Sequence, residues 1–152
     1  MTATRVASAA LAAALQVGCS HAATPEPVSP PAAVTYIVEG GFAGLQERLE
    51  VGTTGSLTLF RDDVEVGAGQ LDAETLGLLH ATVDSPSFRS LDPRYLPKDT
   101  CCDRFTYTVS VDRREDVQTV TTLDGADWPP PLAETLELLQ RARQQVTGPA
   151  EQ

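Results

Sequence analysis

The sequence has little positive charge. It contains 11 lysines and arginines against 21 aspartates and glutamates, so its formal net charge is −10 over 152 residues. A protein that binds nucleic acid needs a basic surface for the phosphates, and this composition argues against nucleic acid as a partner. It argues equally against docking on anionic lipid headgroups through charge. An acidic surface keeps an exported domain soluble and attracts basic partners.

The sequence also lacks the motifs that position catalytic groups. It has neither a G-x-S-x-G elbow nor a Gly-rich phosphate loop. Of its two histidines, His21 precedes the predicted domain, and His80 falls on the apolar face of a predicted helix, as packed histidines do. The carboxylate pairs at 62–63 and 115–116 lie in predicted turns, which rarely hold the geometry that proton transfer needs. We therefore expect no enzymatic activity, no catalytic residue, no metal and no cofactor.

No apolar run is long enough to span a bilayer, which takes about 20 residues. Residues 6–17 instead follow Arg5 and have the length of the apolar region of a signal peptide. The run ends in Val-Gly-Cys-Ser at 17–20, which resembles the bacterial lipobox, where small residues precede a cysteine that receives diacylglycerol. This predicts a signal peptide over 1–18 and a lipid on Cys19. Because Gln16 stands where the lipobox usually has leucine, ordinary cleavage after Ala22 and plain secretion are the alternative.

A spacer separates this signal from the rest of the chain. Residues 19–33 hold four prolines and little to bury, so they favour an extended, semi-rigid conformation that holds a domain away from the headgroups. The expected location is the cell envelope, outside the cytoplasm, with membrane contact through the lipid anchor. Residues 148–152 are expected to be a disordered tail.

The remaining residues, 34–147, predict one α+β domain. Strands are expected at 34–39, 46–52, 56–61, 105–111 and 117–123, where β-branched and aromatic residues alternate with polar ones. In the segment 105–111, Phe, Tyr and the two valines face inward, and Thr and Ser face outward. Residues 64–66 are extended again, and the glycines at 67 and 69 predict a turn. The strand order indicates antiparallel pairing in a sheet of about four to five strands.

Two helices are expected on one face of that sheet. The first begins after Asp72, a good N-cap, and buries Leu76, Leu79 and Val83. The second follows the prolines at 129–131. Its buried residues are expected to be Leu132, Leu136, Leu139, Ala142 and Val146. Between the helices, residues 85–104 predict a long irregular segment. Its core contacts are expected from Phe88, Leu91, Tyr95 and Leu96.

The cysteines at 101 and 102 form an even pair in an oxidising compartment once Cys19 is lipidated. Cys101 and Cys102 are therefore a candidate disulfide, although a bond between neighbours closes a strained ring. The alternatives are that both side chains stay free thiols, or that one of them forms a disulfide with another molecule. A zinc site of Cys101, Cys102 and His80 lacks an obvious fourth ligand.

The domain resembles the emfourin family of proteinaceous inhibitors of thermolysin-like zinc metallopeptidases. The resemblance runs over residues 34–147. It rests on the segments 40–44 (GGFAG), 48–51 (RLEV), 72–83, 103–109 (DRFTYTV) and 127–131 (DWPPP), with the Leu-rich last helix. It implies a protein without chemistry of its own that binds and blocks an extracellular metallopeptidase.

The turn at Gly40, Gly41 and Phe42 is the candidate partner-binding site. Glycine allows close backbone approach, and Phe42 suits a hydrophobic pocket. Phe42 packed inward beside an ordinary Gly-Gly turn is the competing interpretation. If the protein is an inhibitor, this turn should be exposed and ordered. The alternative function, an envelope lipoprotein with a structural or docking role and no protease target, predicts a buried Phe42. A third class, a thiol- or metal-handling protein, predicts Cys101 and Cys102 exposed near another ligand.

Overall fold

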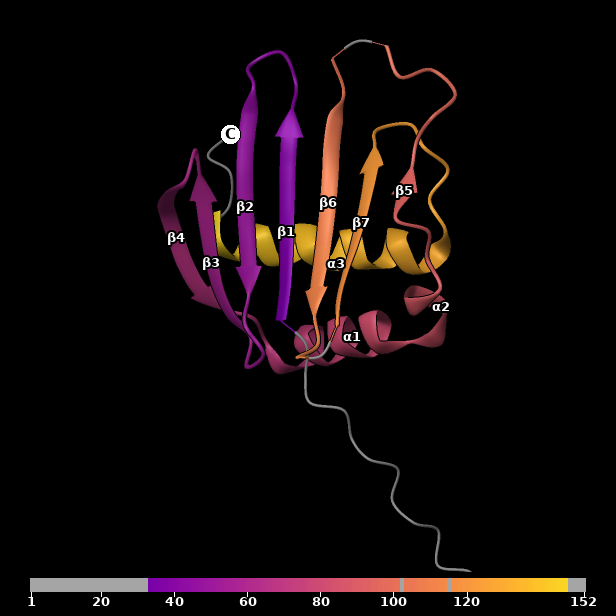
Figure 1. Ribbon diagram of the computed structural model, residues 1–152. Helices are drawn as coiled ribbons and strands as arrows, with labels where there is room; N and C mark the ends of the chain where they lie inside the picture. Colours follow the sequence, from indigo (N-terminus) through magenta and orange to yellow (C-terminus); the bar gives the residue numbers. More distant parts are fainter. Residues whose placement is uncertain (1–32, 102, 115, 148–152) are drawn as a thin grey trace, which may run out of the picture.

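A seven-stranded sheet forms one layer of the molecule (Figure 1). The computed structural model describes residues 33–101, 103–114 and 116–147. Its strands are β1 (Ala33–Gly40), β2 (Leu45–Val51), β3 (Ser56–Arg61), β4 (Val64–Gln70), β5 (Arg94–Tyr95), β6 (Phe105–Asp112) and β7 (Val117–Leu123). They are ordered β4-β3-β2-β1-β6-β7-β5. All neighbours are antiparallel except β5 and β7, which are parallel.

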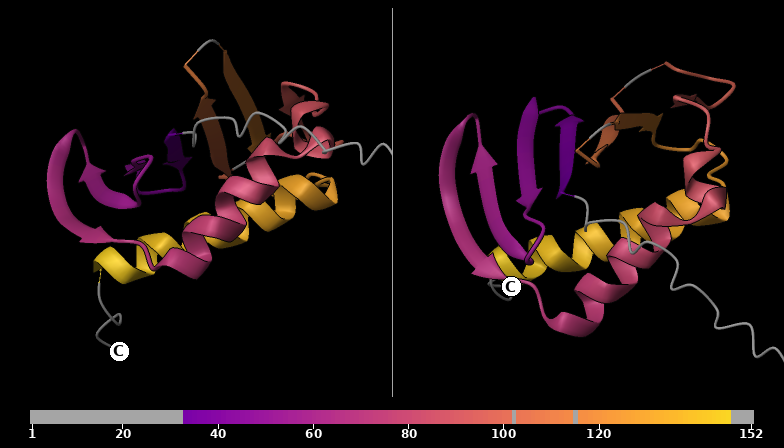
Figure 2. Two further views of the ribbon diagram at one scale, coloured as in Figure 1. Left: turned by 90° about the horizontal axis from the view of Figure 1, so that it is seen from below. Right: turned by 60° about the horizontal axis from the view of Figure 1, so that its bottom comes forward.

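Helices cover one face of this sheet (Figure 2). They are α1 (Ala73–Asp84), α2 (Pro86–Arg89) and α3 (Pro130–Thr147). The helix α3 crosses behind the strands, and α1 runs beside it (Figure 1). As predicted, α1 begins at Asp72, whose Oδ1 accepts a hydrogen bond of 2.8 Å from the backbone N–H of Thr75. This bond satisfies one of the donors that the first helical turn leaves open.

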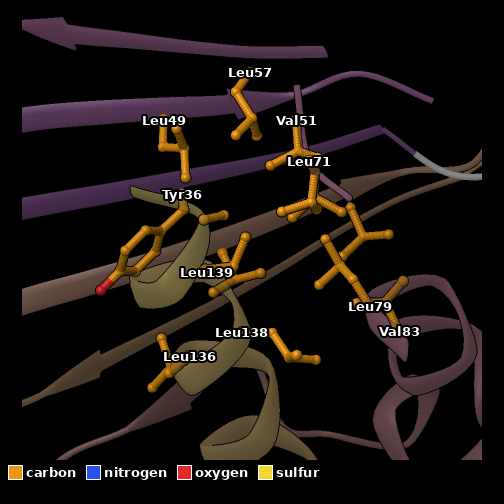
Figure 3. Close-up of a cluster of buried hydrophobic side chains, with 14 of the residues drawn as sticks. Tyr36, Leu49, Val51, Leu57, Leu71, Leu79, Val83, Leu136, Leu138 and Leu139 are labelled. Atoms are coloured by element: carbon orange, nitrogen blue, oxygen red, sulfur yellow. The ribbon is translucent and has the colours of Figure 1, made fainter. Parts of the chain in front are cut away.

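The core lies between the sheet and the two longer helices. Alternate strand residues such as Leu49, Val51 and Leu57 are buried against helical residues such as Leu79 and Leu139 (Figure 3). All five residues predicted for the buried side of α3 lie in or against this core. The predicted alternation of β6 is confirmed at Val109 and Val111, which are buried. Phe105 and Tyr107, also predicted to face inward, are only partly buried.

The α+β class is confirmed, but the predicted size and pairing of the sheet are wrong. The sheet has seven strands and is mixed, and it packs with three helices. One reason is β4, which runs on through the glycines at 67 and 69 that predicted a turn. A Cβ at Gly67 would lie 2.6 Å from Cγ1 of Val146, so glycine lets α3 approach the strand. In this strand, glycine therefore marks close packing.

The other reason is the segment 85–104, which is more ordered than predicted. Ser85 caps the single turn of α2, with Pro86 at its start. The strand β5 has two residues and is held by pairing with Thr121 and Thr122 of β7. Elements this short leave no periodic pattern in a sequence. Phe88 is fully buried as predicted, but the prediction for Leu96 is wrong, because it is 47% exposed. None of the helices in the described part of the chain is long and apolar enough to cross a bilayer.

Candidate functional site

The turn of residues 40–44 joins β1 to β2 at one end of the sheet (Figure 1). Ala33, the first described residue, lies at the opposite end of β1, seven residues before Gly40. A strand rises about 3.4 Å per residue, so about 24 Å separates the start of the described chain from the turn. The turn is therefore on the far side of the domain from the point where the preceding residues join it.

Close packing fixes the backbone of the turn. Gly40 has φ 117°, and a Cβ there would lie 2.4 Å from the carbonyl oxygen of Arg104, the residue before β6. Gly41 has φ 72° and lies over the ring of Phe105. The N–H of Gly44 donates a 2.9 Å hydrogen bond to the carbonyl of Gly41 and closes the turn. Glycine is required here both by the positive φ and by the close approach.

Phe42 lies at the tip of this turn and is 99% exposed. No other large apolar side chain in the described residues is as exposed; Val64 and Val117 come next, at 64% and 63%. An aromatic side chain left wholly in water gains nothing from folding, since burial of apolar area is what stabilises the folded state. Its position therefore does not follow from packing within the domain. The competing interpretation, in which Phe42 packs inward, is not what the structure has.

The flanks of the turn are polar. Gln46 Nε2 donates a 3.3 Å hydrogen bond to Glu39 Oε1 across the base of the hairpin. On one side lies the turn at Asp62 and Asp63, where the N–H of Asp62 donates to the carbonyl of Gln46 over 3.0 Å. On the other side the chain enters β6. The apolar tip of the 40–44 turn is thus set among hydrogen-bonding groups, the usual arrangement of an anchor within a polar rim.

Two tyrosines and one aspartate support the turn from below. The hydroxyl of Tyr107 donates to Asp124 Oδ1 over 2.7 Å, and the N–H of Phe105 donates to Asp124 Oδ2 over 3.2 Å. The rings of Tyr36 and Tyr107 stack with their centroids 6.4 Å apart. Burial raises the pKa of Tyr36 to about 12, and burial and then the carboxylate of Asp124 raise the pKa of Tyr107. Both phenols are therefore neutral hydrogen-bonding groups over the physiological range.

A charged cluster that the sequence did not predict lies under the neighbouring turn. Glu47 has a side chain only 1% exposed, yet it faces the core from β2. Its Oε1 accepts from Arg61 Nη2 and Nε of β3, over 2.6 and 3.0 Å. Its Oε2 forms an ion pair with Arg143 of α3, without the geometry of a hydrogen bond. The available signal was a glutamate at an inward position of the alternating strand, between Leu45 and Leu49.

A pocket lies further along the same end of the sheet. It encloses about 570 Å³, and its walls include Tyr95, Leu96, Lys98, Arg104 and Asp127. The guanidinium of Arg104 is already committed, because it donates to the carbonyls of Cys101 and Asp124 over 3.1 and 2.8 Å. The lining carries both positive and negative charges, and Arg104 already has hydrogen-bond partners, so this pocket does not favour one chemical class of ligand.

The cysteines are only partly covered by the structure. Cys101 is exposed and disulfide-bonded, and its N–H donates to Asp99 Oδ1 over 2.9 Å. Cys102 and Cys19 lie outside the described residues, as do the predicted signal peptide, most of the spacer and the predicted C-terminal tail. His80 belongs to α1, which packs at the other end of the sheet from the start of β6, the strand that follows Cys101 in the chain (Figure 1). The described residues contain no group of three or more His, Cys, Asp or Glu side chains that could hold a metal ion.

Comparison of the sequence with models of known protein families and with curated proteins finds no match.

Proposed function

We propose that this protein is a non-enzymatic binding domain that inhibits a thermolysin-like metallopeptidase. The turn at Gly40, Gly41 and Phe42 enters the active-site cleft of the protease, and the Phe42 ring fills a hydrophobic pocket there. The observation that carries the proposal is the complete exposure of Phe42 on a turn whose backbone is fixed by packing against Arg104 and Phe105.

The rigidity of the 40–44 turn is the physical feature that favours an inhibitor. A flexible loop loses conformational entropy when it binds, whereas a pre-organised turn does not. Large aromatic residues in fully desolvated pockets dominate the energetics of most interfaces. A turn held by glycine packing, with one aromatic ring at its tip, combines both properties. The resemblance of residues 40–44 and 103–109 to emfourins then supplies the class of target.

We further propose that the domain is exported and held in the cell envelope by a lipid on Cys19. The 40–44 turn lies at the far end of β1 from Ala33, the residue nearest to that anchor in the described chain. An anchor joined at that end leaves the turn directed away from the membrane. Secretion without the lipid is the alternative, and it leaves the inhibitor proposal unchanged.

The alternative function is an envelope lipoprotein that docks another protein and has no protease target. It predicts a buried Phe42, so the observed exposure favours the inhibitor. Inhibition of a protease is the measurement that separates the two functions.

The test is a titration of residues 20–152 into several thermolysin-like metallopeptidases while peptide hydrolysis is followed. The proposal expects activity to fall in proportion to added protein until a 1:1 ratio is reached. Mass spectrometry of the mixture should show the added chain intact, which distinguishes an inhibitor from a competing substrate. Undiminished hydrolysis at high excess with every enzyme would reject the inhibitor and leave the docking role.

A further inference from the structure

A pocket of about 330 Å³ opens on the helix-covered side of the sheet, beneath the 40–44 turn. Its apolar wall comes from Val38, Leu45 and the rings of Phe105 and Tyr107. Residues of α3, among them Arg143, form its polar side. Pockets that hold small molecules start at about 300 Å³ and combine an apolar lining with a few polar groups.

Tyr36 connects this pocket to the core. Its ring lies at the margin of the aliphatic cluster, and its hydroxyl points away from the leucines (Figure 3). The same ring lines the pocket and stacks on Tyr107. The aromatic wall therefore belongs to the folded core and does not depend on a mobile side chain.

Arg143 is the one charged residue among those that line the pocket. Its partner Glu47 lies outside the lining and is shared with a second arginine, Arg61. Both oxygens of Asp124, the carboxylate beside Tyr107, accept hydrogen bonds from Tyr107 and Phe105. In a chain with a net charge of −10, a local excess of positive charge around one carboxylate is unusual.

One donor of Arg143 is also unsatisfied. Its Nε is buried, and no acceptor in the described part of the chain forms a hydrogen bond with it. The rest of the side chain is accessible, since Arg143 is 36% exposed and lines the pocket, and a carboxylate is the partner that suits a guanidinium best. Gln140 and Gln144, exposed residues of α3 that also line the pocket, bring two further amide donors.

We propose that this pocket binds a small carboxylic acid with an apolar, aromatic body. The carboxylate pairs with Arg143 and accepts from Gln140 or Gln144, while the body packs against Phe105 and Leu45. A cation is repelled by Arg143, and a neutral apolar molecule offers its partly exposed guanidinium no anion. This inference does not depend on protease inhibition. The acid is either a free metabolite-sized acid or the C-terminal residue of a peptide, which present the same chemistry.

The test is a titration of the full chain with 3-phenylpropionate, following the fluorescence of Trp128. This is the single tryptophan, and its ring packs edge-on against Tyr107, with centroids 5.9 Å apart. The neutral analogue 3-phenylpropionamide is the matched ligand control. We expect saturable binding of the acid and affinity about tenfold or more lower for the amide, because charge-assisted hydrogen bonds are the stronger ones. Equal affinities, or no saturable response up to about 10 mM acid, would overturn the proposal.

Variants of α3 locate the site. Arg143→Gln should weaken binding of the acid about tenfold or more, whereas Arg141→Gln, the same change at an exposed residue outside the pocket, should leave it within about twofold. Because Arg143→Gln also removes a partner of Glu47, Gln144→Glu provides a test that leaves this ion pair intact. It should abolish binding of the acid and spare the amide. Unchanged affinity for the acid in Gln144→Glu would contradict the site.

A third ligand separates the two sources of the acid. N-acetylphenylalanine carries the same ring and carboxylate as the C-terminal residue of a peptide. Tighter binding of this compound than of 3-phenylpropionate assigns the pocket to a peptide end, and weaker binding assigns it to a free acid.

Discussion

The 40–44 turn and the turn at Asp62 and Asp63 both reverse the chain at the same end of the sheet (Figure 1), but they are built differently. In the first, positive φ angles fall on glycines, and the exposed residue is apolar. In the second, φ angles of 49° and 61° fall on aspartates, which are exposed and polar. Glycine is thus used where another chain segment packs closely against the turn. In the other turn, aspartates that carry a Cβ adopt the left-handed backbone at some cost in energy.

The groups beneath the two turns also differ. Below the 40–44 turn lie neutral phenols and the ring of Phe105, with Arg143 at the polar side of the same pocket. Below the aspartate turn lies the buried carboxylate of Glu47, which binds Arg61 and also pairs with Arg143. The first turn is therefore supported mainly by packing and hydrogen bonds, and the second mainly by the ion pair of Glu47 and Arg61. The following variants test this difference in order of decreasing effect.

Glu47→Gln should lower the free energy of unfolding by about 3 kcal/mol, because it leaves two arginines without their shared anion. Urea denaturation measures the change. Glu137→Gln, which removes an exposed partner of Arg141, is the control and should cost no more than about 0.5 kcal/mol. Equal effects of the two variants would mean that the buried cluster does not support the aspartate turn.

Gly40→Ala should lower the free energy of unfolding by about 2–3 kcal/mol. The new Cβ meets the Arg104 carbonyl at 2.4 Å, and the backbone has φ 117°. Gly44→Ala is the matched control, because its φ is 61° but no atom lies within 4 Å of its added Cβ. It should cost about 1 kcal/mol, from the left-handed backbone alone. A cost for Gly44→Ala as large as that for Gly40→Ala would exclude close packing as the reason for Gly40.

Alkaline pH should destabilise the fold through the phenols under the 40–44 turn. Burial raises the pKa of Tyr36 to about 12, above the value of about 10 in the unfolded chain. Its contribution is therefore complete below about pH 10 and is lost as the pH rises toward about 12, at up to about 1.4 kcal/mol per pH unit. The pKa of Tyr107 is also raised, so it acts in the same direction. Chemical denaturation across this range should show a shallower decline for Tyr36→Phe, and an unchanged decline in that variant would refute the assignment.

Asp63→Gly should raise the free energy of unfolding by about 0.5 kcal/mol. Relief of the left-handed backbone, with φ 61° in the native turn, outweighs the extra entropy of glycine in the unfolded chain. The ion pair of Asp63 with Arg48 over 3.6 Å is exposed and adds little. Thermal denaturation gives the sign, and a clear loss of stability would show that the aspartate carboxylate contributes more than its strain costs.

The sequence predicted those parts of the fold that repeat with a regular period. The alternation of β6, the Asp72 cap and the buried side of α3 could all be read from it. The two-residue β5 and the glycines of β4 could not, because a partner elsewhere in the chain holds each of them.

For the site, the sequence indicated the GGFAG turn, but not whether Phe42 packs inward, because that depends on the ring of Phe105 already filling the space under Gly41. The cluster of Glu47 was signalled only by one charged residue at an inward position. Its two arginines come from β3 and α3, which no local pattern connects.

The most direct test of the account is the effect of Phe42→Ala on inhibition of a thermolysin-like metallopeptidase. Val117→Ala is the control, since Val117 is also an exposed apolar residue, at 63%, but begins β7 at the opposite end of the sheet. Phe42→Ala should raise the inhibition constant about 30-fold or more, because it removes the anchor of the interface. The free energy of unfolding should not change. Val117→Ala should inhibit as the unmodified chain does. Full inhibition by Phe42→Ala would contradict the assignment of the 40–44 turn as the binding site.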